Sequence, residues 1–402
     1  MTEFQAASRV NRIKPSPSSL ASARARDLKA EGRDIVDLTV GEPDFDTPEN
    51  IKAAGIAAIQ AGDTKYTAVN GTVALRKAIL AKFERSLGLT YTHEQICVGG
   101  GAKQIIFLAL MASVESGAEV IIPTPYWVSY PDMVLANNGK PVIVDCTEGN
   151  GFKLTAEALE AAITPNTRWL ILNSPCNPSG SVYMREELTA LAAVLLKHPH
   201  VWVLADEIYN EVLFDTEADI NLAIVEPQLK ERLFIVNGVS KTYAMTGWRI
   251  GYGVGNARLV AAINKLQSQM SSCPSSISQA AAVEALNGDQ SFIVEATSVY
   301  RARRDLAVGL LNAVPGLRCP SPNGAFYVFP NCAGVLGRMT PDGKRIESDL
   351  DFILYMLESV GVAALHGSAY GMPGYFRLSI ATSEETIREG CRRIAAAVTG
   401  LR

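Results

Sequence analysis

Three short apolar runs constrain the fold of this chain more than any other feature. They lie at 169–172, 201–205 and 233–236. None of them alternates between apolar and polar residues, which is typical of parallel strands that are covered on both faces. A helical pattern at 185–197 separates the first two runs, as in a strand–helix–strand unit. The chain is therefore predicted to be an α/β protein built on a mostly parallel sheet.

Polar residues end two of these predicted strands. Asn173 follows the run at 169–172, and Asp206 follows the run at 201–205. Ligands of open α/β sheets bind beyond the carboxyl ends of the strands, so the two side chains are expected to face one shared site. An aspartate that only caps the next helix is the alternative interpretation of Asp206.

A lysine stands in the loop after the third run. Lys241 lies between the predicted strands 233–236 and 248–254, in a segment that also contains Gly238, Gly247 and Arg249. Burial and a neighbouring cation both disfavour an ammonium group, so they lower the lysine pKa and leave a free amine that can form a Schiff base with an aldehyde. An isolated loop lysine is usually just exposed, but the surrounding glycines and the arginine make Lys241 a candidate nucleophile.

The turn at 99–102 is a candidate phosphate site. Three glycines precede Ala102, and an apolar-faced helix is predicted from Lys103 to Ser113. Backbone N–H groups at such a turn and at a helix N-terminus bind anions. The spacing is not that of a nucleotide-binding P-loop, and the glycines at 251–255 do not have the spacing of a dinucleotide-binding motif, which argues against an oxidoreductase.

Composition narrows the classes of partner and compartment. The 402 residues carry a net charge of −4 without a basic block, which argues against nucleic acid or a membrane surface as the main partner. Seven scattered cysteines and four histidines show no metal-ligand spacing, so no metal site is expected. The first 14 residues lack the apolar core of a signal peptide, and no later apolar run approaches membrane-spanning length, which predicts a cytoplasmic protein.

Seven segments of this chain together resemble one enzyme family, the class I aminotransferases, which are fold-type I pyridoxal-phosphate enzymes. The segments cover nearly the whole chain in the family's order, and the likeness is closest to the bacterial aspartate aminotransferase subgroup. They are GEPDFDTP at 41–48, TKY at 64–66, PYWVSY at 125–130, NSPCNPSG at 173–180, DEIY at 206–209, the lysine segment at 238–251 and FRLS at 376–379.

The resemblance implies a fold and its division into domains. A large domain with a mostly parallel sheet is expected to carry the cofactor, together with a smaller α+β domain. We expect residues 1–46 to form an N-terminal arm and part of the small domain, 47–297 the large domain, and 298–402 the small C-terminal domain. The family also implies a homodimer with shared active sites.

The same resemblance implies roles around pyridoxal phosphate. Lys241 would bind the cofactor covalently and act as general base and acid, and Asp206 would keep the pyridine nitrogen protonated. Asn177 and Tyr209 would hydrogen-bond the ring hydroxyl oxygen, with Tyr209 also counted among the catalytic residues. Trp127 would stack on the ring.

The phosphate group of the cofactor is assigned a separate set of residues. The backbone of Gly101 and Ala102, together with Ser240 and Arg249, would hold it. Tyr66 would reach it from the other subunit of the dimer. Hydroxyl residues that animal-type members carry in this loop are replaced here, so binding is expected to depend on the backbone and on Arg249.

Substrate recognition is implied in the same way. Arg377 would bind the α-carboxylate of an amino acid, and Gly41, Trp127 and Asn177 would line the pocket. Lys103 takes the position of the subgroup's distal-carboxylate lysine. The expected substrates are therefore aspartate or glutamate, with 2-oxoglutarate or oxaloacetate as acceptor.

Other functions stay open at this point. Some members of the subgroup accept prephenate or aromatic amino acids, and Lys14 and Ser18 near the N-terminus are candidate contacts for such substrates. β-Elimination or decarboxylation would use the same lysine and aspartate. A regulator with a silent aminotransferase domain would carry a DNA-binding module, for which the arm before residue 16 is too short.

Overall fold

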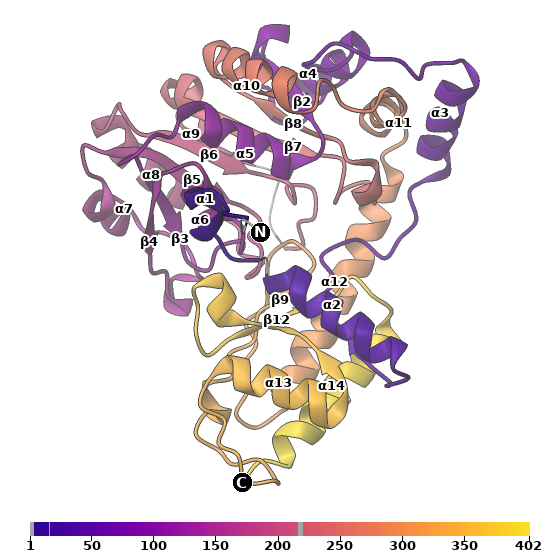
Figure 1. Ribbon diagram of the computed structural model, residues 1–402, viewed down its shortest axis with the longest axis vertical. Coiled ribbons are helices and arrows are strands. Elements are labelled where there is room, and N and C mark those ends of the chain that lie inside the picture. The colour runs from indigo at the N-terminus through magenta and orange to yellow at the C-terminus, as the bar shows by residue number, and fades with distance from the viewer. Residues whose placement is uncertain (1–3, 16, 216–219) are drawn as a thin grey trace.

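The computed structural model describes residues 4–15, 17–215 and 220–402, and a seven-stranded sheet forms its larger part (Figure 1). The strand order is β2-β8-β7-β6-β5-β3-β4, and β8 runs antiparallel to both of its neighbours while the other pairs are parallel. The predicted α/β class with a mostly parallel sheet is confirmed. The strands are β2 (Ile96–Gly99), β3 (Glu119–Pro123), β4 (Lys140–Val144), β5 (Thr167–Asn173), β6 (Trp202–Asp206), β7 (Leu233–Gly238) and β8 (Gly251–Val254).

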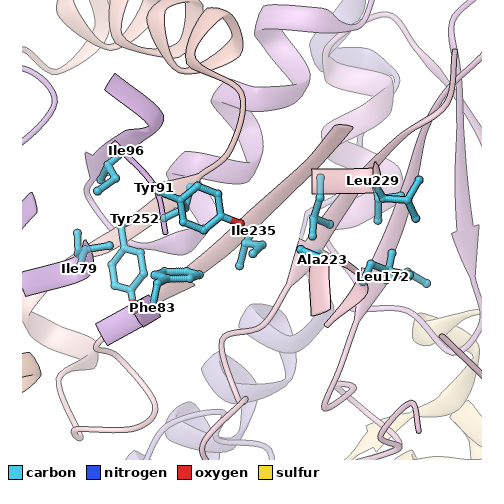
Figure 2. Packing of buried hydrophobic residues seen from close by; sticks show 14 of the residues in the cluster. Ile79, Phe83, Tyr91, Ile96, Leu172, Ala223, Leu229, Ile235 and Tyr252 are labelled. Carbon is cyan, nitrogen blue, oxygen red and sulfur yellow. The ribbon is translucent and has the colours of Figure 1, made fainter. Parts of the chain in front are cut away.

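The central strands are apolar through their middle positions because both faces of the sheet are covered. On β5, Leu170 and Leu172 belong to one hydrophobic cluster, while Trp169 and Ile171 belong to another. Successive side chains of a strand point to opposite faces, so this alternation places one core on each side of the sheet. In the first core, Ile79 and Phe83 lie close to Tyr91 and Tyr252 (Figure 2), and the rings of Phe83 and Tyr91 meet edge to face at 5.5 Å.

Helices cover the sheet and connect its strands. None of the helices in the described ranges is long and apolar enough to cross a lipid bilayer. Those of the larger part and the N-terminal segment are α1 (Ser8–Asn11), α2 (Pro17–Ala30), α3 (Glu49–Gln60), α4 (Val73–Leu87), α5 (Ala102–Ser113), α6 (Tyr130–Ala136), α7 (Ala156–Ala162), α8 (Arg185–Lys197), α9 (Leu222–Val225), α10 (Ala257–Met270) and α11 (Ser276–Asn287).

A smaller part of the molecule has its own hydrophobic core and two small sheets. The helix α12 (Ser291–Asn312) leads to it from the larger part, and α2 lies beside it (Figure 1). Its core joins Val36 and Leu38 to side chains in the segment 208–214 and to residues between 296 and 401. The domain boundaries themselves stay a prediction. Its other elements are β1 (Val36–Asp37) paired with β10 (Val362–Ala363), the sheet β11 (Leu365–His366), β12 (Phe376–Ser379) and β9 (Tyr327–Val328), and the helices α13 (Asp349–Val360) and α14 (Glu384–Thr399).

The predicted strand at 248–254 is wrong at its start. Thr246–Trp248 forms a single 3₁₀ turn, Arg249 has a left-handed conformation with φ 55°, and β8 begins only at Gly251. The indole of Trp248 is instead held by a hydrogen bond from its Nε1 to the Thr47 hydroxyl at 3.0 Å. The extra loop length lets the Arg249 side chain turn toward the start of α5.

Candidate active site

A cavity of about 490 Å³ lies at the carboxyl ends of β5, β6 and β7 and reaches the smaller part of the molecule. Most of the predicted site residues line it. They are Gly41, Ala102, Lys103, Trp127, Asn177, Asp206, Tyr209, Ser240, Lys241, Arg249 and Arg377. Its wall also contains residues that were not predicted, among them Ser22, Arg26 and Thr39 from the N-terminal segment and Tyr327 from β9.

Lys241 lies in the loop between β7 and β8, and its ammonium group points into the cavity. Its Nζ donates a hydrogen bond of 2.5 Å to the carbonyl oxygen of Gly41. Burial lowers the pKa of Lys241 to about 8, with further lowering by Arg377 and Arg249 that Glu42 opposes. The sequence argument expected this shift from burial and Arg249. At pH 7 about a tenth of the side chain is then the neutral amine, the form that attacks carbonyl carbon.

Asp206 is the last residue of β6 and is buried. The hydroxyl of Tyr130 donates to its Oδ2 at 2.6 Å, and the amide of Ile208 donates to its Oδ1 at 3.3 Å. Burial nevertheless raises the pKa of Asp206 to about 6. Asn173 at the end of β5 lies opposite Asp206 in the register of the two parallel strands. The Nδ2 of Asn173 donates a hydrogen bond to the Asp206 carbonyl oxygen at 2.9 Å. The two strand ends thus meet at one edge of the sheet, as their sequence positions predicted.

The turn before α5 has the geometry of an anion site. Gly101 has φ 98°, and Ala102 begins the helix, so the first N–H groups of α5 have no partner within the helix. The guanidinium of Arg249 lies against the turn and donates to the Gly100 carbonyl oxygen at 3.1 Å. A Cβ on Gly101 would lie 2.3 Å from the Arg249 Nη2, and one on Gly251 would lie 2.1 Å from the Ala102 nitrogen. Only glycine at both positions lets the N-terminus of α5 and the Arg249 guanidinium lie this close together.

Arg377 is a buried cation without an anionic partner among the described residues. Its Nη1 donates to the Asn177 Oδ1 at 3.0 Å, and its Nη2 donates to the Thr39 carbonyl oxygen at 2.6 Å. Its Nε has no hydrogen-bond partner within the described ranges. The guanidinium lies over the rings of Tyr327 at 4.2 Å and Tyr370 at 5.5 Å. Because an unpaired buried charge is strongly unfavourable, the geometry is that of a receptor for a carboxylate.

A second cation, Lys103, lies beside Trp127 in the cavity wall. The Nζ of Lys103 lies 4.7 Å from the centroid of the Trp127 ring, and burial followed by Arg249 lowers its pKa. Trp127 itself is fixed by an edge-to-face contact with Tyr130 at 5.3 Å. Ring and ammonium together form a wall that suits a flat ring with an anionic group beside it.

Among the predicted site residues whose side chains or backbone the structure describes, Gly101, Tyr66 and Lys14 are not part of the cavity wall. The side chain of Tyr66 is 91% exposed and lies outside the cavity wall, which agrees with its expected role in another subunit but does not test it. Lys14 is exposed and also outside the wall, since its backbone amide is held by Asp132 at the start of α6. Within one chain, Lys14 therefore makes no contact with the cavity. The side chain of Ser18 lies outside the described residues.

Two tyrosines among the residues that the sequence reasoning missed share one property. Tyr130 and Tyr327 sit within apolar segments and look like core residues by pattern. A buried tyrosine hydroxyl needs a partner, and here the partners are Asp206 and Tyr209. A tyrosine within an otherwise apolar run near a predicted site was the signal that could have found them.

With this geometry established, comparison with known proteins assigns the class. The family model "Aminotransferase class I and II" matches residues 33–394. The chain belongs to this family and is an aminotransferase.

Particular relatives extend over nearly the whole chain. An aspartate aminotransferase of Rhizobium meliloti (strain 1021) is 55% identical over 98% of this chain and 96% of its own length. An aspartate/prephenate aminotransferase of Cereibacter sphaeroides is 51% identical over 97% of this chain and 98% of its own length. Among solved structures, the Rhizobium meliloti aspartate aminotransferase superposes with a TM-score of 0.97 at 54% identity over all of both chains. The Thermus thermophilus aspartate aminotransferase with maleate does so with a TM-score of 0.92 at 38% identity, over 98% and 100% of the chains.

Replacing Gly101 by alanine tests the anion site at the start of α5. The new Cβ has to displace the Arg249 guanidinium, so we expect binding of pyridoxal phosphate to the cofactor-free protein to weaken about tenfold or more, measured by fluorescence titration. Gly62→Ala is the matched control, because Gly62 has φ 75° but no atom within 4 Å of its added Cβ. Equal affinities for the two variants would contradict this account.

Asp206→Asn tests the burial of the carboxylate. The pKa of Asp206 is raised from an ordinary value of 3.8 to about 6 in the folded protein. Its stabilising contribution is therefore fully present below the pKa of the unfolded chain, where Asp206 is protonated, and is lost as the pH rises through 6. We therefore compare the free energy of unfolding of the cofactor-free variant with that of the cofactor-free wild type. The difference, variant minus wild type, should rise by about 2 kcal/mol from pH 4.5 to pH 7.5. Urea unfolding at the two pH values measures this, and a pH-independent difference would show that burial does not perturb Asp206.

Proposed function

We propose that this aminotransferase holds pyridoxal phosphate on Lys241 and moves the amino group of a dicarboxylic amino acid, aspartate or glutamate, to a 2-oxo acid. The observation that carries the proposal is the meeting of Lys241 and Asp206 with Arg377, a buried guanidinium that no anion of the described chain neutralises. A nucleophilic amine, an anionic hydrogen-bond acceptor and a carboxylate receptor in one cavity are the groups that such a reaction needs.

The residues present fit the cofactor of this family. The N–H groups at the start of α5, Ser240 and Arg249 would hold the phosphate, and the glycines there leave no room for a side chain. Trp127 would cover one face of the ring, and Asp206, which lines the same cavity, would accept a hydrogen bond from the ring nitrogen. Pyridoxal phosphate supplies an aldehyde that takes up the amino group and a ring that withdraws electrons from the α-carbon.

Proton transfer falls to Lys241. With its amine free inside the cavity, Lys241 would take the α-proton as a base near neutral pH, for which its lowered pKa suits it. It would then return a proton as the conjugate acid. Tyr209 and Asn177 would hydrogen-bond the ring oxygen, while Arg377 and Asn177 orient the substrate carboxylate.

The charge of the cavity supports a dicarboxylic substrate. Its wall contains the cations Arg26, Lys103, Lys241, Arg249 and Arg377, against the carboxylate of Asp206. A phosphate and two carboxylates together offset this excess, whereas a monocarboxylic substrate leaves a cation unpaired. The aspartate aminotransferase name of the Rhizobium meliloti relative and the maleate bound by the Thermus thermophilus enzyme support the same substrate class.

Prephenate is the second candidate substrate, favoured by the name of the Cereibacter sphaeroides relative. It is also a dicarboxylate, so it satisfies the same charge argument. Arg26 of α2 lies in the cavity wall, and among the described residues it makes no ion pair or hydrogen bond.

We also propose a homodimer with shared sites. Apolar or aromatic side chains exposed on the larger part support a covered surface there. They are Ile56, Ile59, Tyr66, Val73 and Met270. Tyr66 would then contact the phosphate site of the partner subunit.

A panel of amino donors tests the proposed function. The holoenzyme is mixed with each amino acid in turn, and loss of its visible absorption is compared with the 2-oxo acid formed. Aspartate and glutamate should give the fastest conversion with one 2-oxo acid per cofactor aminated, and Lys241→Ala should abolish turnover. Release of ammonia would indicate elimination, and release of carbon dioxide would indicate decarboxylation, and either as the main product would refute the proposal.

Lys103→Ala tests the second carboxylate contact. The variant should lose about 10- to 100-fold in kcat/KM for aspartate and far less for alanine, because only aspartate carries the distal charge. Lys77→Ala on the exposed side of α4 is the matched control. Equal losses for both substrates would assign Lys103 a role other than distal recognition.

A further inference from the structure

The side chain of Tyr327 connects two groups that the proposed function treats separately. Tyr327 lies on β9 and is 1% exposed. Its hydroxyl lies 2.9 Å from the hydroxyl of Tyr209, and the face of its ring lies 4.2 Å from the Arg377 guanidinium. We propose that Tyr327 is a positioning residue that couples the charge of Arg377 to the hydrogen bond that Tyr209 donates to the cofactor.

The direction of the hydroxyl–hydroxyl bond follows from proton counting. Each phenol has one proton, and either of the two can be the donor at 2.9 Å. If Tyr209 donates its proton to the ring oxygen of pyridoxal phosphate, as proposed above, then Tyr327 must donate to Tyr209. The inference therefore rests on the proposed function, and Tyr327 becomes the donor at the start of a chain of two hydrogen bonds.

The guanidinium strengthens this donor. Burial raises the pKa of Tyr327, and Arg377 opposes that effect by favouring the phenolate. A cation over the face of the ring draws electron density from the phenol, and the low dielectric of a buried site makes the effect larger than in water. A stronger donor at Tyr327 polarises the hydroxyl of Tyr209 and makes Tyr209 a stronger donor in turn.

Substrate binding reverses this effect. A carboxylate on Arg377 offsets the cation, so Tyr327 and then Tyr209 become weaker donors. The ring oxygen is then less stabilised as an anion, and the nitrogen that joins Lys241 to the cofactor holds its proton more tightly. Because a protonated nitrogen makes the carbon bonded to it more electrophilic, binding of the carboxylate prepares that carbon for attack by the substrate amine.

The surroundings of Tyr327 keep its hydroxyl in place. A Cβ on Gly41 would lie 3.0 Å from this hydroxyl, so the turn that accepts the Lys241 hydrogen bond passes directly against it. The ring of Phe326 meets that of Tyr209 at 5.3 Å from the other side. The pair of hydroxyls is thus enclosed, and a different pairing would need the turn or the strand to move.

Tyr370 supplies a matched control. Its ring also lies under Arg377, at 5.5 Å, and it is fully buried. Its hydroxyl has no hydrogen-bond partner among the described residues, so it has no described link to Tyr209. Tyr370→Phe removes a hydroxyl near the same cation without breaking the proposed chain.

The test is a spectroscopic pH titration of the holoenzymes with and without maleate, an unreactive dicarboxylate. Without maleate, Tyr327→Phe should raise the pH midpoint at which the cofactor's visible absorption titrates by about 0.5–1 pH unit. It should also reduce the rise in this midpoint that maleate causes by half or more. Tyr370→Phe should titrate as the wild type does. Tyr209→Phe and the double variant Tyr209→Phe/Tyr327→Phe should share one midpoint, because Tyr327 acts through Tyr209.

Each outcome decides one question. A Tyr327→Phe enzyme with the midpoint and maleate shift of the wild type would overturn the coupling. Additive shifts in the double variant would also overturn it, since they would mean that Tyr327 acts independently of Tyr209. Failure of the proposed function is distinguishable, because the wild type itself would then show no visible absorption band that titrates.

Discussion

The burial of charge in one cavity is the constraint on which the rest of this structure depends. Asp206, Lys241 and Arg377 are ionisable groups withdrawn from water, and withdrawal is unfavourable for each of them. Fixed dipoles of the protein offset part of this unfavourable free energy. Examples are the Tyr130 hydroxyl at Asp206 and the Thr39 carbonyl at Arg377. What remains unpaired is what a ligand can satisfy, and the proposed binding of carboxylate and phosphate rests on it.

The cavity exists only where the two parts of the molecule meet. Asp206 and Lys241 come from the end of the seven-stranded sheet, whereas Arg377 and Tyr327 come from the small sheet of the other part. Asn177 joins them, because its side chain accepts from Arg377 while its backbone belongs to the loop after β5. Any movement between the two parts would therefore change the carboxylate receptor and the tyrosine pair together.

Sequence patterns predicted the sheet and the residues at its strand ends, because continuous apolar runs and the polar residues that follow them are local features. They could not predict Tyr130 and Tyr327, whose roles depend on which strands are neighbours and on the register between them. The error at Trp248 has a similar origin. Its apolar side chain suggested a strand, but the left-handed conformation of Arg249 and the bond to Thr47 are set by tertiary contacts. The contact expected of Lys14 was taken from a resemblance. Within one chain, the position of α1 against α6 leaves that lysine outside the cavity wall, and its role stays a prediction.

The central claim is that one amine, that of Lys241, holds the cofactor. Reduction of the holoenzyme with borohydride, followed by trypsin and mass spectrometry, tests it most directly because the reduced bond survives digestion. The account predicts that the added mass of the reduced cofactor appears on the peptide 233–249, at Lys241, with cleavage after that lysine blocked. Added mass on Lys103 or another lysine, or on none, would contradict it.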